Sequence, residues 1–219
     1  MATRLLLLDL LQKYQQAGGP ALHLEAVGGV LAAKRVQAGE PFDVVILDAD
    51  VIGKLIASGQ VLPGSKVDLV QSGIAVAVKA GASQPDIGSE ESVRQAVLAA
   101  CSISYSTGPS GLALARLFER WGIAEQIRGR IVTPPPGTPV GSLVAKGEAE
   151  LGFQQLSELL PLKGISILGP LPDAIQVITT FSAGICVSCQ QVEQARSLLS
   201  YLASPATAAT KQGLGMTPA

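Results

Sequence analysis

The chain has 219 residues, of which 47% are hydrophobic and 15% charged, and its 16 Lys and Arg nearly balance its 17 Asp and Glu. This length suits one large domain or two small lobes, and the apolar content supplies a sizeable core. The balanced charge, without a basic stripe or polybasic run, argues against nucleic-acid binding and membrane-surface binding. No apolar stretch reaches the ~18 residues needed to span a membrane, so we expect no membrane insertion.

Helical and strand patterns alternate in the first third of the chain. Residues 3–17 are expected to form a helix with Thr3 as its N-cap, and the run Gly18-Gly19-Pro20 ends it. A strand is expected at 21–27, followed by Gly28-Gly29. The further elements expected here are a helix at 30–38, a buried strand at 43–47, a helix at 49–58 and a strand within 69–79.

The alternation continues to the end of the chain. We expect helices at 90–100, 110–121, 140–146, 156–160, 191–202 and 206–212, and strands at 101–106, 130–132, 150–153, 165–168 and 174–187. This order predicts an α/β fold with mostly parallel, doubly wound sheets. Such a fold normally begins with a strand, whereas this sequence begins with a helix; either one lobe lacks a strand or upstream residues supply it.

A proline-rich segment at 133–139 contains three consecutive prolines, which favour a stiff polyproline II conformation. It is either a surface linker or a rigid wall beside a site.

The few metal-binding and redox-active residues are poorly placed for either role. Cys186 and Cys189 form a C-x-x-C within an expected strand, where positions three apart point to opposite faces. Cys101 leaves an odd cysteine count, and His23 is the single histidine. Because a zinc site needs about four nitrogen or sulfur ligands, we expect no metal and no cofactor.

The most informative motif is Ser-Thr-Gly-Pro-Ser-Gly at 106–111, which we call the anion cradle. It precedes an expected helix whose apolar face carries Leu114, Leu117, Phe118 and Trp121. Pro109 suits the first helical position. The free N–H groups of that turn and the helix dipole favour an anion, and Thr107 and Ser110 add hydroxyl donors. The alternative is an ordinary strand–turn–helix connection.

Four turns follow strands at their carboxyl ends, where open α/β sheets bind ligands. They are Gly28-Gly29, Asp48-Ala49-Asp50, the anion cradle and Gln154-Gln155. If the two halves of the chain form two lobes, all four turns can face one cleft.

The order of several short segments resembles the periplasmic molybdate-binding protein family, a branch of the type 2 solute-binding proteins of ABC importers. The resemblance covers nearly the whole length. It is carried by residues 37–46 (QAGEPFDVVI), 54–59 (KLIASG), 146–153 (KGEAELGF), 201–207 (YLASPAT) and 213–218 (GLGMTP).

This resemblance implies a two-lobed type 2 periplasmic-binding-protein-like fold with crossing hinge strands near Val78 and Val177. Lobe I would hold residues 1–78 and 178–219, and lobe II residues 79–177. The lobes of such proteins close on a tetrahedral oxyanion, held by hydroxyls and backbone N–H groups without a countercharge. The ligand-binding positions that the resemblance implies here are Thr3, Gly28, Gly29, Ala49, Thr107, Gly108, Ser110, Gly111 and Gln154.

The chain departs from the family at two of these places. Gly29 stands where the family usually has Ser, and Gln154 or Gln155 where it usually has Tyr. A Gln side chain offers both a donor and an acceptor, which suits a small carboxylate or hydroxy acid better than molybdate. Asp48 and Asp50 would repel an anion unless they turn away, and capping the helix that follows is their alternative role.

We therefore expect a non-enzymatic solute-binding protein that clamps a small anion, for ABC-type transport with a permease partner or for sensing. Two alternatives are the ligand-sensing domain of a transcription regulator, and an isomerase or lyase built on the same fold. Candidate acids or bases for an enzyme are His23, Asp48, Asp50 and Glu148. No export signal is visible, so the sequence as it stands indicates a cytoplasmic protein; a signal segment upstream of this numbering would make it periplasmic.

Overall fold

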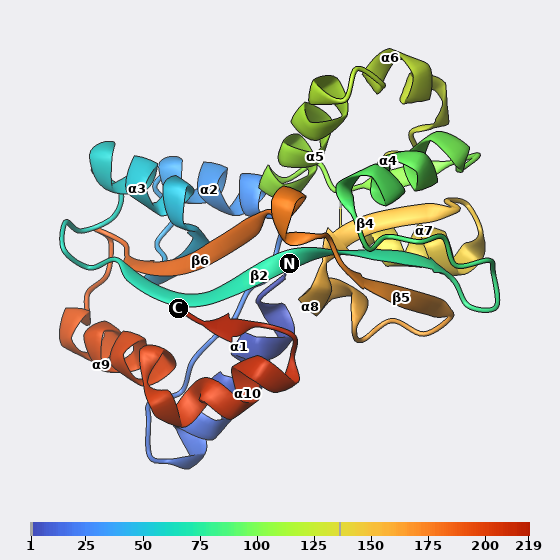
Figure 1. Cartoon of the computed structure of the whole chain (residues 1–219). Coiled ribbons are helices and arrows are strands. Elements are labelled where there is room, and N and C mark those ends of the chain that lie inside the picture. The colour runs from blue at the N-terminus through green and yellow to red at the C-terminus, as the bar shows by residue number, and fades with distance from the viewer. Residues whose placement is uncertain (1, 136) are drawn as a thin grey trace. The chain divides into compact units, whose positions relative to one another are not determined.

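The structure is a computed structural model that describes residues 2–135 and 137–219 (Figure 1). It is a mixed α/β structure that divides into two compact units. Unit 1 consists of Met1–Ser72 and Thr179–Ala219, and unit 2 of Gly73–Ile178. The chain passes from one unit to the other within the long strand β2 (Val67–Lys79) and again at the start of β6 (Ile178–Ile185).

Unit 1 is a small sheet with helices on both faces. Its strands besides β2 and β6 are β1 (Val44–Asp48) and β7 (Thr217–Pro218). Its helices are α1 (Arg4–Gln16), α2 (Gly29–Gln37), α3 (Ala49–Ala57), α9 (Val192–Ala203) and α10 (Ala208–Gly213), with a 3-10 turn at Pro205–Thr207. Strand β1 runs antiparallel to β6, with Val44 opposite Ile185 and Asp48 opposite Phe181.

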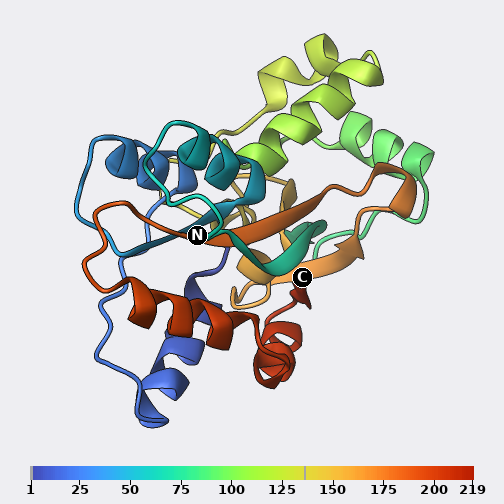
Figure 2. The same cartoon turned by 90° about the vertical axis from the view of Figure 1, so that its left-hand side faces the viewer.

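Helices cover both faces of the unit 1 sheet, with α2 and α3 on one face and α1 and α9 on the other (Figures 1 and 2). Val45 and Leu47 belong to the core under α2 and α3, whereas Val44 and Ile46 pack against the core under α1 and α9. Because successive residues of a strand point to opposite faces, one five-residue strand joins two cores.

Unit 2 contains the second part of β2 with β3 (Ile103–Tyr105), β4 (Leu151–Gln155) and β5 (Ile165–Pro170). Its helices are α4 (Glu90–Ala99), α5 (Pro109–Arg120), α6 (Ala124–Ile127), α7 (Val140–Lys146) and α8 (Leu156–Leu159), with 3-10 turns at Arg128–Arg130 and Asp173–Ile175. Phe118 lies at the centre of its core, with ring centroids 5.7 Å from Tyr105, 5.8 Å from Trp121 and 6.2 Å from Phe153.

The register of β3 and β4 decides where the candidate site residues of unit 2 lie. These neighbours are parallel, with Ile103 opposite Leu151 and Tyr105 opposite Phe153. Their carboxyl ends therefore meet at one edge of the sheet. The anion cradle leaves β3 at this edge, and the chain after Gln155 leaves β4 beside it.

The α/β class expected from the sequence is confirmed, but the strand pairing is not mostly parallel. Of the pairs with a defined register, β3–β4 is parallel, whereas β1–β6, β2–β4, β2–β5 and β2–β7 are antiparallel. A helical crossover between neighbouring strands requires them to be parallel, and β3 and β4 are joined in this way through α5, α6 and α7. Strands β2 and β6 connect the two units and are not joined to their neighbours by such a crossover, so they need not be parallel to them.

Two expected strands do not form. Residues 19–28 adopt neither helix nor strand, although Leu22 and Leu24 point inward in the alternating manner of a strand. At 130–132, the turn Arg128–Arg130 is 3-10, and Ile131 makes a single parallel bridge to Ile103. Both segments have strand composition, but a strand also needs a neighbouring backbone to accept its hydrogen bonds.

The proline-rich segment also runs without helix or strand at 133–135, and Pro136 lies outside the described residues. Within the part of the chain that the structure describes, no helix combines the length and apolarity required to cross a membrane.

Candidate functional site

The anion cradle begins α5 as the sequence predicts. Pro109 is the first helical residue, and Gly108 is the N-cap in an extended conformation (φ −84°, ψ −170°). The first helical hydrogen bond runs from the Leu112 N–H to the Gly108 carbonyl at 3.0 Å. The N–H groups of Ser110 and Gly111 therefore lie ahead of the helical ladder, at the positive end of a 12-residue helix.

Close packing inside the anion cradle explains why position 111 is glycine. A Cβ atom at Gly111 would lie 1.5 Å from the Ser106 carbonyl oxygen and 2.6 Å from its carbonyl carbon. The Ser106 and Ser110 hydroxyls are 3.1 Å apart and share a hydrogen bond, while Thr107 is exposed. The turn is thus folded tightly over the start of α5, with two hydroxyls beside the N–H groups.

At the carboxyl end of β4, Phe153 packs against α5, so the next side chain, that of Gln154, points to the opposite face of the sheet, which α7 covers. Gln154 is 4% exposed, and its amide oxygen accepts a hydrogen bond of 3.2 Å from the Gly141 N–H of α7. Its side chain also hydrogen-bonds Glu158 of α8. Burial raises the pKa of the Glu158 carboxyl above its usual range, and the hydrogen bond from Gln154 opposes that shift.

Two buried hydroxyls in the same unit have no hydrogen-bond partner among the described residues. They belong to Ser104, which is in β3 and wholly buried, and to Ser157, which precedes Glu158. A buried hydroxyl without a partner costs about 1–3 kcal/mol. Water or a polar ligand that reached these groups would recover that free energy.

The candidate residues of unit 1 lie at the starts of three helices. Thr3 occupies the N-cap position of α1, but its backbone is helical (φ −86°, ψ −2°) and its hydroxyl makes no capping hydrogen bond. The expected N-cap position of Thr3 is confirmed, but its side chain does not cap the helix, since a capping side chain needs a non-helical backbone to direct its oxygen to the free N–H groups. Gly28 precedes α2 and Gly29 begins it, and Ala49 begins α3.

Asp48 caps α3, because its Oδ1 accepts a hydrogen bond of 2.9 Å from the Asp50 N–H. We expect Asp48→Ala to lower the free energy of unfolding by about 1 kcal/mol, the usual loss when an N-cap is removed. Asp50→Ala removes only an exposed charge near the helix start and is expected to cost less, about 0.3 kcal/mol. Denaturant unfolding of both variants measures the difference, and equal losses would contradict the capping role.

The structure thus groups the nine predicted binding residues by unit. In unit 2, Thr107, Gly108, Ser110, Gly111 and Gln154 gather at the shared edge of β3 and β4. In unit 1, Thr3, Gly28, Gly29 and Ala49 mark helix starts. The sequence analysis did not identify Ser104, Ser157 or Glu158 as candidate site residues. For Glu158 the sequence did contain a signal: it follows Gln154 by four residues, at the start of an expected helix.

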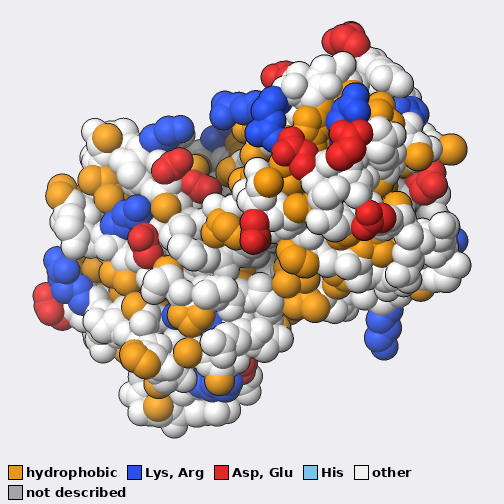
Figure 3. All heavy atoms as spheres, in the orientation of Figure 1, with side chains coloured by type: hydrophobic (Ala, Val, Ile, Leu, Met, Phe, Trp, Pro, Cys, Tyr) orange, Lys and Arg blue, Asp and Glu red, His pale blue; other side chains and the backbone are white. Residues whose placement is uncertain are grey.

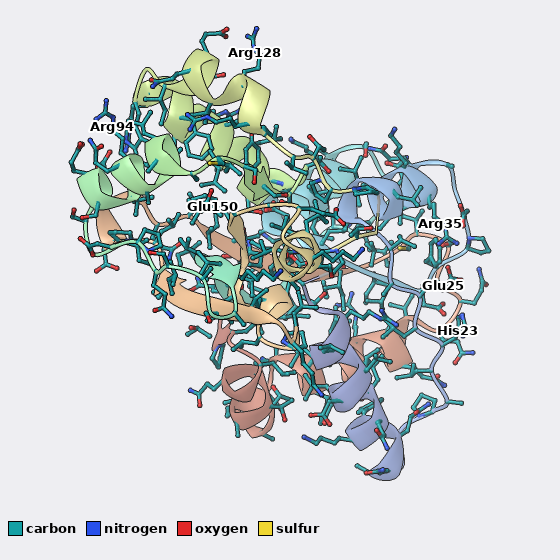
Figure 4. The ribbon with its side chains drawn as sticks, turned by 90° about the vertical axis from the view of Figure 1, so that its right-hand side faces the viewer. His23, Glu25, Arg35, Arg94, Arg128 and Glu150 are labelled. Carbon is teal, nitrogen blue, oxygen red and sulfur yellow. The ribbon has the colours of Figure 1, made fainter. Side chains whose placement is uncertain are left out.

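The remaining titratable candidates, His23 and Glu148, are exposed side chains. The His23 side chain is 85% exposed, with its Nε2 3.7 Å from Glu25, and Glu25 binds Arg35 of α2 at 2.7 Å (Figure 4). Glu148 is an exposed residue 3.9 Å from Lys146. On the face shown in Figure 3, acidic and basic side chains are interspersed, and no single sign of charge dominates it.

Both cysteines of the C-x-x-C pair are buried and unbonded. Burial raises the pKa of the Cys186 thiol to about 11, so little reactive thiolate is present near neutral pH. We expect iodoacetamide at about pH 8 to modify the exposed Cys101 and leave Cys186 unmodified, as read by peptide mass spectrometry. Labelling of Cys186 at the rate of Cys101 would contradict this.

Among the described residues, no group of three or more His, Cys, Asp or Glu side chains is placed to hold a metal ion.

Comparison with known proteins places this geometry among solute-binding proteins. A family model for bacterial extracellular solute-binding proteins matches residues 1–217. An aconitate isomerase from a Pseudomonas species is 40% identical over an alignment of 213 residues that covers 94% of this chain and 80% of that protein.

Solved structures agree on the fold. The periplasmic molybdate-binding protein of Azotobacter vinelandii has a TM-score of 0.74 at 23% identity, with 96% of this chain and 95% of that one covered. A substrate-binding domain attributed to a molybdenum ABC transporter of Clostridium difficile has a TM-score of 0.77 at 13% identity, with 100% and 95% covered. The expected two-lobed periplasmic-binding-protein fold and the resemblance to molybdate-binding proteins are thereby confirmed.

Proposed function

Because the chain belongs to the bacterial extracellular solute-binding protein family, we propose that it binds a small organic polycarboxylate and interconverts the isomers of aconitate. The observation that carries this proposal is the 40% identity to an aconitate isomerase across 94% of the chain. Two features of unit 2 support the proposal: a helix start whose free N–H groups suit a carboxylate, and a carboxyl whose pKa is raised.

The anion cradle offers what a carboxylate needs. The N–H groups of Ser110 and Gly111 precede the helical ladder, and the dipole of α5 favours negative charge at that end. The hydroxyls of Ser106 and Ser110 can reorient to donate to an added oxygen. We propose that one carboxylate of the ligand binds here.

Glu158 is the proton carrier in this proposal. Aconitate has a carbon–carbon double bond beside a CH2 group. When a base removes a proton from that CH2 carbon, the electron pair spreads over three carbons; return of the proton to the former vinyl carbon shifts the double bond. A carboxyl whose pKa is raised by burial is a stronger base than an exposed one and becomes an acid after it takes the proton.

A second function, delivery of a bound anion to an ABC permease, is favoured by the family itself. The molybdate-binding relatives share the fold, and the cradle requires no countercharge from Lys or Arg. In that case the protein works outside the cytoplasmic membrane, as the family description implies, and ligand binding without chemistry is its whole activity.

Incubation of the purified chain with cis-aconitate and with trans-aconitate, followed by proton NMR in D2O, distinguishes the two functions. We expect each isomer to yield the other, with deuterium entering the carbon that regains the proton. A thermal-shift panel of both aconitates, citrate, molybdate, tungstate and sulfate then reports binding; a ligand at ~100 Kd stabilises by about 2.7 kcal/mol. Molybdate stabilisation without isomerisation would overturn the enzyme and favour transport.

A further inference from the structure

The side-chain amide of Gln176 lies where the chain passes between the units. Unit 2 begins at Gly73, within β2, and ends at Ile178, so Gln176 comes two residues before the second crossing. Gln176 follows the 3-10 turn Asp173–Ile175, and the Ile175 side chain is 5% exposed in the core of unit 2. The turn is thereby anchored to unit 2, and the Gln176 side chain reaches from it to β2.

This amide makes four hydrogen bonds, each of them to the backbone. Its Oε1 atom accepts from the N–H groups of Ile74 and Val177, both at 2.9 Å. Its Nε2 atom donates to the carbonyl of Ile74 at 3.1 Å and to that of Leu171 at 3.2 Å. A glutamine amide has two N–H donors and an oxygen with two lone pairs, so the hydrogen-bonding capacity of this amide is fully used.

Gln176 takes the place of a neighbouring strand at this point of β2. The ladder between β2 and β5 ends with Ala75 opposite Pro170, and the next residue of β2 is Ile74. The N–H and C=O groups of Ile74 pair with the Gln176 amide as they would with the peptide groups of a strand. The backbone of unit 2 is therefore hydrogen-bonded up to Ile74, the residue beside its boundary at Gly73.

Gly73 leaves room for this amide. A Cβ atom at Gly73 would lie 3.1 Å from both Cδ and Nε2 of Gln176 and 3.3 Å from its Oε1. These distances are shorter than ordinary van der Waals contacts, so an alanine here would push against the amide. Because the two residues are in contact, we expect the effects of substitutions at Gly73 and Gln176 to be coupled.

We propose that Gln176 is a positioning residue of the hinge: it fixes both crossing segments to unit 2 and confines rotation between the units to residues 72–73 and 178–179. A hinge consists of a few residues that absorb large changes of φ and ψ. Ile74 and Val177 cannot absorb such changes without breaking their hydrogen bonds to the amide, and a buried peptide group without a partner is unfavourable. The protein is thereby restricted to a narrower range of unit orientations. This inference depends on the two units alone and not on the ligand or the reaction proposed above.

Distances between spin labels on the two units test the proposal. A chain with Gln37→Cys carries one nitroxide label at this exposed end of α2 in unit 1 and another at the exposed Cys101 in unit 2. Gln176→Ala removes all four hydrogen bonds, and we expect it to make the distance distribution, measured by double electron–electron resonance, roughly twofold wider. An unchanged width would overturn the proposal even if the melting temperature fell, because the four bonds would then only stabilise the fold.

Two further variants make the test specific to the hinge. Gln126→Ala, at an exposed position of α6, is the matched control and is expected to leave the width unchanged. Gly73→Ala keeps the amide but crowds it, so it is expected to widen the distribution and replaces Gln176→Ala if that variant does not fold. In a chain that already carries Gln176→Ala, adding Gly73→Ala is expected to have no further effect. Further widening in that chain would show that Gly73 acts independently of Gln176, and would overturn the proposal.

Discussion

Glu158→Gln is expected to lower the rate of aconitate isomerisation by about 10²–10⁴-fold, the usual contribution of a positioned acid or base. The substitution keeps the size of the side chain and leaves a group that can still hydrogen-bond Gln154, so folding and ligand affinity are expected to change little. Initial rates followed by NMR and affinities measured by calorimetry separate the two effects. A Glu158→Gln chain that isomerises aconitate at the unsubstituted rate would remove Glu158 from the mechanism.

The pH profile gives this prediction a second readout. Glu158 acts as a base when it is deprotonated, so kcat/KM is expected to fall as the pH drops through its pKa. Because burial raises that pKa, the acidic limb is expected above the ordinary glutamate value of 4.5 and to disappear in Glu158→Gln. Glu148→Gln, which alters an exposed carboxyl of the same unit, is the matched control and is expected to retain the limb.

Gly111→Ala is expected to disrupt the anion cradle and to destabilise unit 2. The added methyl group would lie 1.5 Å from the Ser106 carbonyl oxygen, and its neighbours there are backbone atoms that cannot rotate away. The turn must therefore move, and overpacking of this kind usually costs about 1–3 kcal/mol or more. We expect a lower melting temperature and at least a tenfold loss of affinity for aconitate, measured by thermal unfolding and calorimetry.

Gly108→Ala, in the same turn, is the matched control. Its Cβ would meet only the Ser106 hydroxyl at 3.8 Å, an ordinary contact, and φ at this residue is −84°, which alanine adopts without strain. The backbone N–H groups stay in place, so stability and affinity are expected to remain near those of the unsubstituted chain. Equal losses in both variants would show that the close approach at Gly111 is not what shapes the cradle.

The sequence by itself predicted the features that depend on neighbours within about one turn of the chain. The period of apolar residues identified α5, Pro109 marked its first residue, and Asp48 caps α3 as its position suggested. The order of helices and strands also gave the α/β class, and several short segments gave the family. Each of these signals is local, because caps, helix starts and amphipathic faces are set by residues three or four apart.

Only the tertiary structure decided the features that depend on remote partners. Residues 21–27 have the composition of a strand, but no strand in the described part of the chain pairs with them. The antiparallel pairs of β2 follow from a chain that passes twice between units, which no local pattern records. Burial raised the pKa of Glu158, and the carbonyl of Ser106 left room only for glycine at 111. Strand pairing and burial depend on residues that are far apart in the sequence, and the close approach at Gly111 depends on how its turn is folded. These interactions therefore exist only once the chain is folded.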